Sequence, residues 1–113
     1  MPAVHPRRRR EQFAEAQKKT CPEVHITSIE PAPSPNQEIY TQVNGTGFGP
    51  SETGQAKAEI FEDLSQEWLE VDVILWSDTV IIVDVSPYAW CVTALLLRIT
   101  NACGNVDEYD PCA

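Results

Sequence analysis

The sequence predicts an all-β sandwich of about seven strands, preceded by a basic N-terminal arm. Short runs of β-branched and aromatic residues recur at intervals of roughly 8–12 residues, which is typical of the strands of such a sandwich. Turn residues separate these runs, and no helical pattern lies between them. A chain of 113 residues has room for one such domain. We therefore expect an arm over residues 1–20 and one β domain over residues 21–113.

The arm differs from the rest of the chain in charge and in pattern. Residues 1–20 carry a net charge of +4, whereas residues 21–113 carry −13. The arm's prolines favour extended backbone and its later residues favour helix, but it has no apolar stripe that could dock on a core. No apolar segment follows the arginines, so we expect neither a secretory signal nor a membrane span. The arm residues expected to bind a partner are Arg7, Arg8, Arg9, Arg10, Phe13, Lys18 and Lys19.

The first four predicted strands are supported by apolar residues that recur along them. Residues 24–30 contain two isoleucines and end at the proline-rich stretch 31–35. Residues 38–44, 56–63 and 68–76 alternate with period two, as half-buried strands do. The residues that this alternation places on one side are Ile39, Thr41, Val43, Ala56, Ala58, Ile60, Leu69, Val71, Val73 and Leu75.

The last three predicted strands differ from one another in polarity. Residues 79–85 are β-branched apart from Asp84, and residues 91–100 form a long apolar run that is typical of a central strand. Residues 105–110 are short and polar, as a closing strand at the edge of a sheet would be.

The stretch VNGTGFGPSE, residues 43–52, has three glycines within five positions. A phosphate-binding glycine loop leads into a helix, whose N-terminal amides face the phosphate. Here the spacing is GxGxG rather than GxGxxG, and the segment that follows has a strand pattern. We therefore predict a structural turn in which Gly45, Gly47 and Gly49 bend the backbone and Phe48 closes the end of the sandwich.

Five segments together resemble the IPT/TIG domain, which has an immunoglobulin-like fold: ITSIEP, VNGTGFGP, AEIFED, WSDTVIIVDVSP and LLLRITNACG. The most specific are the Gly45–Gly49 turn and the triplet Ser77-Asp78-Thr79 before a β-branched strand. The resemblance covers residues 24 to about 110 and implies an immunoglobulin-like sandwich in which the glycine turn is structural. The four cysteines, an acidic insert around residues 62–70 and the basic arm depart from the family pattern.

The topology that this resemblance implies also suggests a pairing for the cysteines. It places the start of the first strand near the turn between the last two strands, and the start of the sixth strand near the end of the last one. We therefore expect the disulfides Cys21–Cys103 and Cys91–Cys112. The alternatives are four buried free thiols in a cytosolic protein, and a zinc site, which the lack of a CxxC pair disfavours.

No catalytic or metal-binding set stands out, so we expect no enzyme, no cofactor and no metal. Neither His5 nor His25 has ligand spacing or a nucleophile partner, and we expect His25 to be exposed or at an edge. The carboxylates near the C-terminus lack the spacing of a calcium loop. The acidic residues expected on solvated faces or edges are Glu59, Glu62, Asp63, Glu67, Glu70, Asp72, Asp107, Glu108 and Asp110.

Proteins with IPT/TIG domains include receptors, transcription factors, carbohydrate-active enzymes and phage virion proteins, so the fold alone does not fix the role. We expect a bacteriophage virion protein, made in the host cytoplasm and released by lysis, that decorates or cements the capsid in multiple copies through its arm. The alternative is a carbohydrate-binding accessory module that stacks sugars on Trp68, Trp76 and Trp90, with Tyr88 nearby in the sequence. Nucleic acid is not an expected partner, because the acidic body would repel it.

Overall fold

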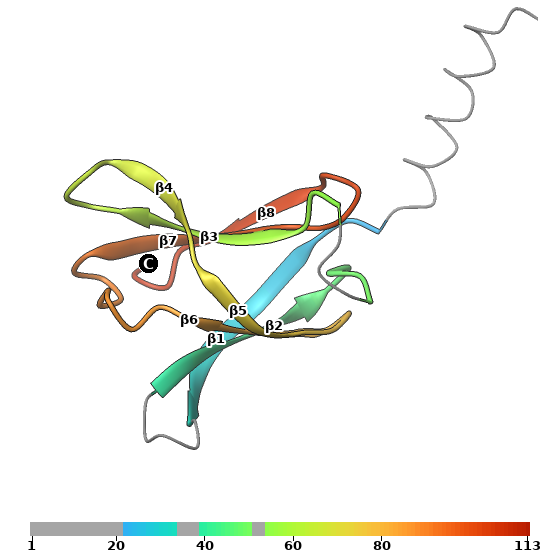
Figure 1. Cartoon of the computed structure of the whole chain (residues 1–113), viewed down its shortest axis with the longest axis horizontal. Helices are drawn as coiled ribbons and strands as arrows, with labels where there is room; N and C mark the ends of the chain where they lie inside the picture. Colours follow the sequence, from blue (N-terminus) through green and yellow to red (C-terminus); the bar gives the residue numbers. More distant parts are fainter. Residues whose placement is uncertain (1–21, 34–38, 51–53) are drawn as a thin grey trace, which may run out of the picture.

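The computed structural model describes residues 22–33, 39–50 and 54–113. The whole expected arm and Cys21 lie outside these ranges. The described residues form eight strands and no helix (Figure 1). The strands are β1 His25–Pro33, β2 Ile39–Thr46, β3 Lys57–Glu62, β4 Glu67–Glu70, β5 Asp72–Trp76, β6 Val80–Asp84, β7 Ala94–Thr100 and β8 Val106–Tyr109.

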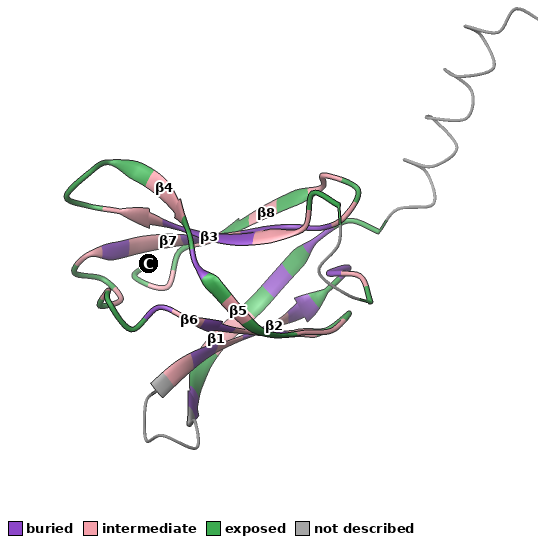
Figure 2. Ribbon diagram, viewed as in Figure 1, coloured by how far each residue is buried: buried purple, intermediate pink, exposed green. Residues whose placement is uncertain are grey.

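The strands form two antiparallel sheets of four strands each. One has the order β1-β2-β6-β5 and the other the order β4-β3-β7-β8. The buried residues concentrate on the strands where the two sheets face each other (Figure 2). The prediction of an all-β sandwich is confirmed, with eight strands in place of about seven.

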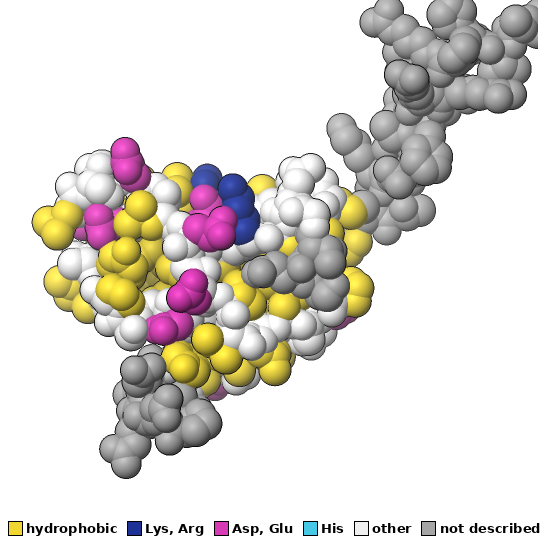
Figure 3. All heavy atoms as spheres, in the orientation of Figure 1, with side chains coloured by type: hydrophobic (Ala, Val, Ile, Leu, Met, Phe, Trp, Pro, Cys, Tyr) yellow, Lys and Arg dark blue, Asp and Glu magenta, His cyan; other side chains and the backbone are white. Residues whose placement is uncertain are grey.

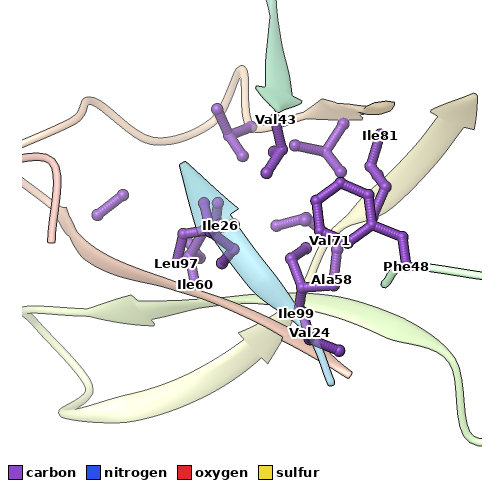
Figure 4. Packing of buried hydrophobic residues seen from close by; sticks show 13 residues of the cluster. Val24, Ile26, Val43, Phe48, Ala58, Ile60, Val71, Ile81, Leu97 and Ile99 are labelled. Atoms are coloured by element: carbon purple, nitrogen blue, oxygen red, sulfur yellow. The ribbon is translucent and has the colours of Figure 1, made fainter. Parts of the chain in front are cut away.

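The core lies between the sheets and draws on both. Phe48 is completely buried, with its ring close to Ile81 and Val71 (Figure 4). Among the described residues, the other completely buried apolar side chains are Val43, Ile81 and Val83 from one sheet and Ala58, Ile60, Ala94, Leu97 and Ile99 from the other. Each large aliphatic side chain in this set contributes about 1.5–3 kcal/mol by its removal from water.

The segment 68–76 is two strands in different sheets, so the prediction of one continuous strand there is wrong. β4 pairs with β3, whereas β5 pairs with β6. The chain crosses between the sheets at Val71, which is buried and donates its backbone N–H to the carbonyl oxygen of Ala58 at 3.0 Å. A period-two pattern continues through such a crossing, because the apolar side chains face the same core from either sheet.

A bulge in β5 also reverses the expected orientation of Leu75. The register with β6 shifts between Val73 and Leu75, which adds one residue to β5. Ile74 and Leu75 are consequently 51% and 45% exposed. Trp76 instead packs against the core. An inserted residue exchanges the two faces of a strand, which explains the correction.

Two strand boundaries differ from the sequence-based expectation by three residues. β1 continues through Pro31 to Pro33 instead of ending before them. Proline is tolerated there because β1 is an edge strand, so half of its N–H groups have no ladder partner. β7 begins at Ala94 rather than at residue 91, because Cys91 adopts a positive φ of 66° and belongs to a turn.

Candidate functional site

The glycine turn is hydrogen-bonded to the turn before β6. Gly45 donates its backbone N–H to the Thr79 carbonyl oxygen at 3.0 Å, and Phe48 donates to that of Asp78 at 3.1 Å. The N–H of Gly49 donates to Asp78 Oδ1 at 3.2 Å. These three amides are therefore used within the protein rather than presented to a phosphate.

The φ angles of this turn favour glycine at two positions, and Gly45 has no room for a Cβ atom beside the carbonyl oxygen of His25. Gly47 and Gly49 have φ values of 77° and 91°, in the region that other residues rarely adopt. A Cβ atom at Gly47 would also collide with the carbonyl oxygen of Glu23. The turn carries Phe48 back into the core, so its glycines serve the fold.

Asn101 organises the same end of the sandwich, and no sequence pattern singled it out. Its side chain is buried and makes four hydrogen bonds. Nδ2 donates to the carbonyl oxygens of Pro22 and Gly47, at 2.9 and 3.1 Å. Oδ1 accepts from the backbone N–H groups of Cys103 and Asn105. One amide therefore joins the segment before β1, the glycine turn and the β7–β8 turn.

The three tryptophans are not brought together into one platform. Trp76 packs edge to face on Phe48, with ring centroids 6.5 Å apart, and donates its indole Nε1–H to the Phe48 carbonyl oxygen at 3.2 Å. Trp90 donates its Nε1–H to Thr41 Oγ1 at 3.0 Å, near the opposite end of β2. Trp68 lies in β4, in the other sheet. The two ends of an eight-residue strand are about 25 Å apart, so these rings face separate surroundings.

Trp68 belongs to a charged face of the β4-β3-β7-β8 sheet. The Arg98 guanidinium lies 4.0 Å from the Trp68 ring centroid, and Arg98 Nε pairs with Glu59 Oε1 at 3.0 Å. Lys57 Nζ lies 3.8 Å from Glu59 Oε2. Lys57 and Arg98 are the only two cationic residues in positions 21–113, so both cations of the body share one carboxylate. In Figure 3 the blue side chains form one small group against magenta carboxylates.

Two acidic residues expected in solvated positions have internal partners. Glu59 is only 7% exposed, because β3 lies between β4 and β7 and is covered by their side chains. Asp107 Oδ2 accepts a hydrogen bond from the backbone N–H of Ile26 at 2.8 Å and so ties β8 to β1. Glu59 therefore does not lie on a solvated face as expected, whereas Asp107 lies on the edge strand β8, as expected, and has an internal partner as well. His25 is exposed, as expected.

An aromatic cleft opens where the end of β1, the start of β2 and the segment after β6 meet. We define it by six residues that line it: Ile29, Tyr40, Val85, Ser86, Tyr88 and Trp90. Its volume is about 460 Å³. Only Trp90 of the three tryptophans lines it. The other two aromatic residues could not be associated with it from the sequence, because they come from separate segments.

A disulfide joins Cys91 to Cys112, with the Cα atoms 5.5 Å apart. It ties the turn before β7 to the segment after β8 and agrees with the expected pairing. The free-thiol alternative is wrong for these two residues. The expected bond between Cys21 and Cys103 involves a residue outside the described part of the chain.

The partner-binding residues expected in the arm also lie outside the described ranges: Arg7, Arg8, Arg9, Arg10, Phe13, Lys18 and Lys19. Within those ranges, no group of three or more His, Cys, Asp and Glu residues is placed to hold a metal ion. None of the described segments forms a helix with the length and hydrophobicity of a bilayer crossing.

Compared with known proteins, the chain matches no family model, no curated protein and no solved structure.

Proposed function

We propose that the body of this protein is an immunoglobulin-like sandwich of the IPT/TIG type. The strand order supports this proposal. Immunoglobulin constant domains have strands A, B, E and D in one sheet and C, F and G in the other. The order β1-β2-β6-β5 corresponds to the first sheet, and β3-β7-β8 corresponds to the second, with β4 added at its edge.

The two most specific motifs of the resemblance give further support. The glycine turn and the Ser77-Asp78-Thr79 turn are far apart in the sequence, yet their backbones are hydrogen-bonded. The two turns therefore form one structural unit at this end of the sandwich. Each turn depends on the other for its hydrogen bonds, which explains why both motifs occur in the same sequence.

The protein acts as a non-enzymatic structural and interaction protein, most specifically a bacteriophage capsid decoration or cement subunit or another minor virion protein. One observation carries this proposal: both cations of the acidic body are paired with Glu59. The body therefore offers no unpaired cation to an acidic partner. The six Arg and Lys residues of positions 1–20 are the remaining source of positive charge in the chain.

The division of charge suggests how the subunit docks. The arm's arginines pair bidentately with carboxylates on coat subunits, and Phe13 supplies an apolar anchor. Ordering an extended arm costs conformational entropy. Many copies on a symmetric shell offset that cost through avidity.

The body's disulfide fits a particle that functions outside the cell. Disulfides persist in oxidising surroundings and are rare in the cytosol. A virion released by lysis reaches such surroundings without secretion of its subunits. The covalent link between Cys91 and Cys112 then stabilises the end of the chain against unfolding.

The proposal is tested by density-gradient sedimentation of the full chain and of a variant that begins at residue 21, each expressed in the cells that make the protein. We expect the full chain to sediment with an intact particle and the truncated chain to remain at the top of the gradient. The truncated chain should keep the circular dichroism and thermal midpoint of a folded β domain. Full decoration by the truncated chain would overturn the role of the arm, and a full chain that never sediments with a particle would overturn the virion role.

A further inference from the structure

We propose that the aromatic cleft is a binding site for a neutral saccharide. This site lies on the body, so the inference stands whether or not the arm attaches the protein to a particle. The residues that support this proposal are two tyrosines and one tryptophan, which the fold places around one cleft.

The cleft has an apolar floor and aromatic walls. Ile29 and Val85 form the floor, and both pack in or against the core. The walls are Tyr40, Tyr88 and Trp90. An aromatic ring offers a flat apolar surface, which complements the C–H face of a pyranose ring.

The walls are held in place before any ligand arrives. The Trp90 indole is fixed by its hydrogen bond to Thr41 Oγ1, and Thr41 is only 6% exposed. Tyr88 donates its backbone N–H to the carbonyl oxygen of Val85 at 2.8 Å, which closes the turn that carries it. Pre-positioned side chains lose less conformational entropy on binding.

The cleft also presents polar groups at its edge. Among the residues that the structure describes, the hydroxyl groups of Tyr40, Tyr88 and Ser86 have no hydrogen-bond partner, so they can donate to and accept from sugar hydroxyls. Glu30, also at the edge, is held by Gln42 Nε2, which donates to its Oε1 at 3.0 Å. An anchored carboxylate is a strong acceptor for a sugar hydroxyl.

The charge around the cleft and the volume of the cleft indicate which class of ligand fits it. Glu30 at the edge and the net −13 of residues 21–113 disfavour anionic ligands such as uronates, sulfated sugars and phosphates. The volume of about 460 Å³ falls within the range of about 300–1,000 Å³ that is typical of small-molecule sites. These properties together favour a short neutral segment of a glycan.

The test uses the indole Nε1–H signals of the full ¹⁵N-labelled chain. Its three tryptophans give three signals, which single Trp→Phe variants assign. The probes are maltohexaose, cellohexaose, xylohexaose and N-acetylchitohexaose, with a proline-rich decapeptide as the competing ligand class. We expect at least one hexasaccharide to shift the Trp90 signal in a saturable way, while the Trp68 and Trp76 signals stay in place.

Matched variants connect the binding to the cleft. We expect Tyr88→Ala to weaken the affinity about tenfold or more, and Tyr88→Phe, which keeps the ring and removes the hydroxyl, by about two- to fivefold. Ser86→Trp fills the cleft from an exposed position and should abolish binding without removing any core contact. Trp68→Phe, in the other sheet, should bind as the unchanged chain does.

Three results would overturn the saccharide site. The first is that no hexasaccharide shifts the Trp90 signal. The second is that Ser86→Trp binds as tightly as the unchanged chain while its thermal midpoint is unchanged. The third is that only the proline-rich peptide shifts the signal, which would assign the cleft to peptides. None of these results bears on sedimentation with a particle, so the two proposals fail separately.

Discussion

Trp90 donates its indole Nε1–H to Thr41 Oγ1 at 3.0 Å, across 49 positions of sequence. This bond joins the segment between β6 and β7 to the start of β2 and fixes one wall of the aromatic cleft. Because Thr41 is largely buried, the indole is its hydrogen-bond partner inside the protein. The bond therefore contributes both to stability and to the shape of the cleft.

We expect Trp90→Phe to lower the free energy of unfolding by about 1–2 kcal/mol, because the ring is largely kept while the buried Thr41 hydroxyl loses its partner. Urea unfolding followed by circular dichroism measures the change. In a double-mutant cycle with Thr41→Val, the double variant should lose about 1 kcal/mol less than the sum of the losses of the two single variants. Strictly additive losses would show that the two side chains do not interact in solution.

Two substitutions in the glycine turn share an unfavourable φ but differ in whether the added methyl group meets another atom. Gly47→Ala places a methyl group against the Glu23 carbonyl oxygen at a positive φ, whereas Gly49→Ala meets no atom within 4 Å and has only the unfavourable φ. We expect a loss of about 3 kcal/mol or more for Gly47→Ala and of about 1–2 kcal/mol for Gly49→Ala. Thermal unfolding of the two variants measures the difference, and equal losses would contradict the close approach of Glu23.

Asn101→Ala should be among the most damaging single substitutions in the body. It leaves two backbone carbonyl groups and two backbone N–H groups without their side-chain partner. We expect a loss of about 3 kcal/mol or more. Asn105→Ala is the matched control, because its side chain makes one exposed bond to the Pro22 carbonyl oxygen and should cost about 1 kcal/mol or less. Comparable losses for both variants would show that Asn101 does not organise this end of the sandwich.

The Cys91–Cys112 bond closes a segment with a sequence separation of 21 residues. Replacing both cysteines by alanine should lower the free energy of unfolding by about 3 kcal/mol, because the unfolded chain gains freedom. When the unchanged chain is alkylated without prior reduction, mass spectrometry should show this bond intact. A thermal midpoint that does not fall in the double variant would mean that the bond adds no stability.

The core of the central strands was predictable from the sequence, because the alternation matches the buried face of each sheet, with Thr41 and Val43 in one and Ala58 and Ile60 in the other. The same pattern misleads over residues 68–76. It continues through the crossing at Val71, and it carries no mark of the bulge that turns Leu75 outward and Trp76 inward. Alternation indicates which residues are buried while the strand keeps its register, but it does not indicate the sheet to which they belong.

The candidate site was less predictable than the fold. The cleft combines Tyr40, Tyr88 and Trp90, which come from segments that meet only after the sheets form. Asn101 bonds to Pro22 and Gly47 across 79 and 54 positions, and no local pattern marks such a contact. By contrast, the conformational need for glycine is local, which is why the turn could be inferred from its spacing.

We propose that the arm's arginines bind an acidic surface on the coat and that the body makes no contact with that surface. The most direct measurement is the occupancy on purified particles of two variants in which Arg7–Arg10 are all replaced, by lysine in one and by glutamate in the other. We predict partial loss with lysine, which keeps the charge and loses the bidentate geometry, and complete loss with glutamate. Full occupancy by the glutamate variant would show that these arginines do not attach the protein to the particle.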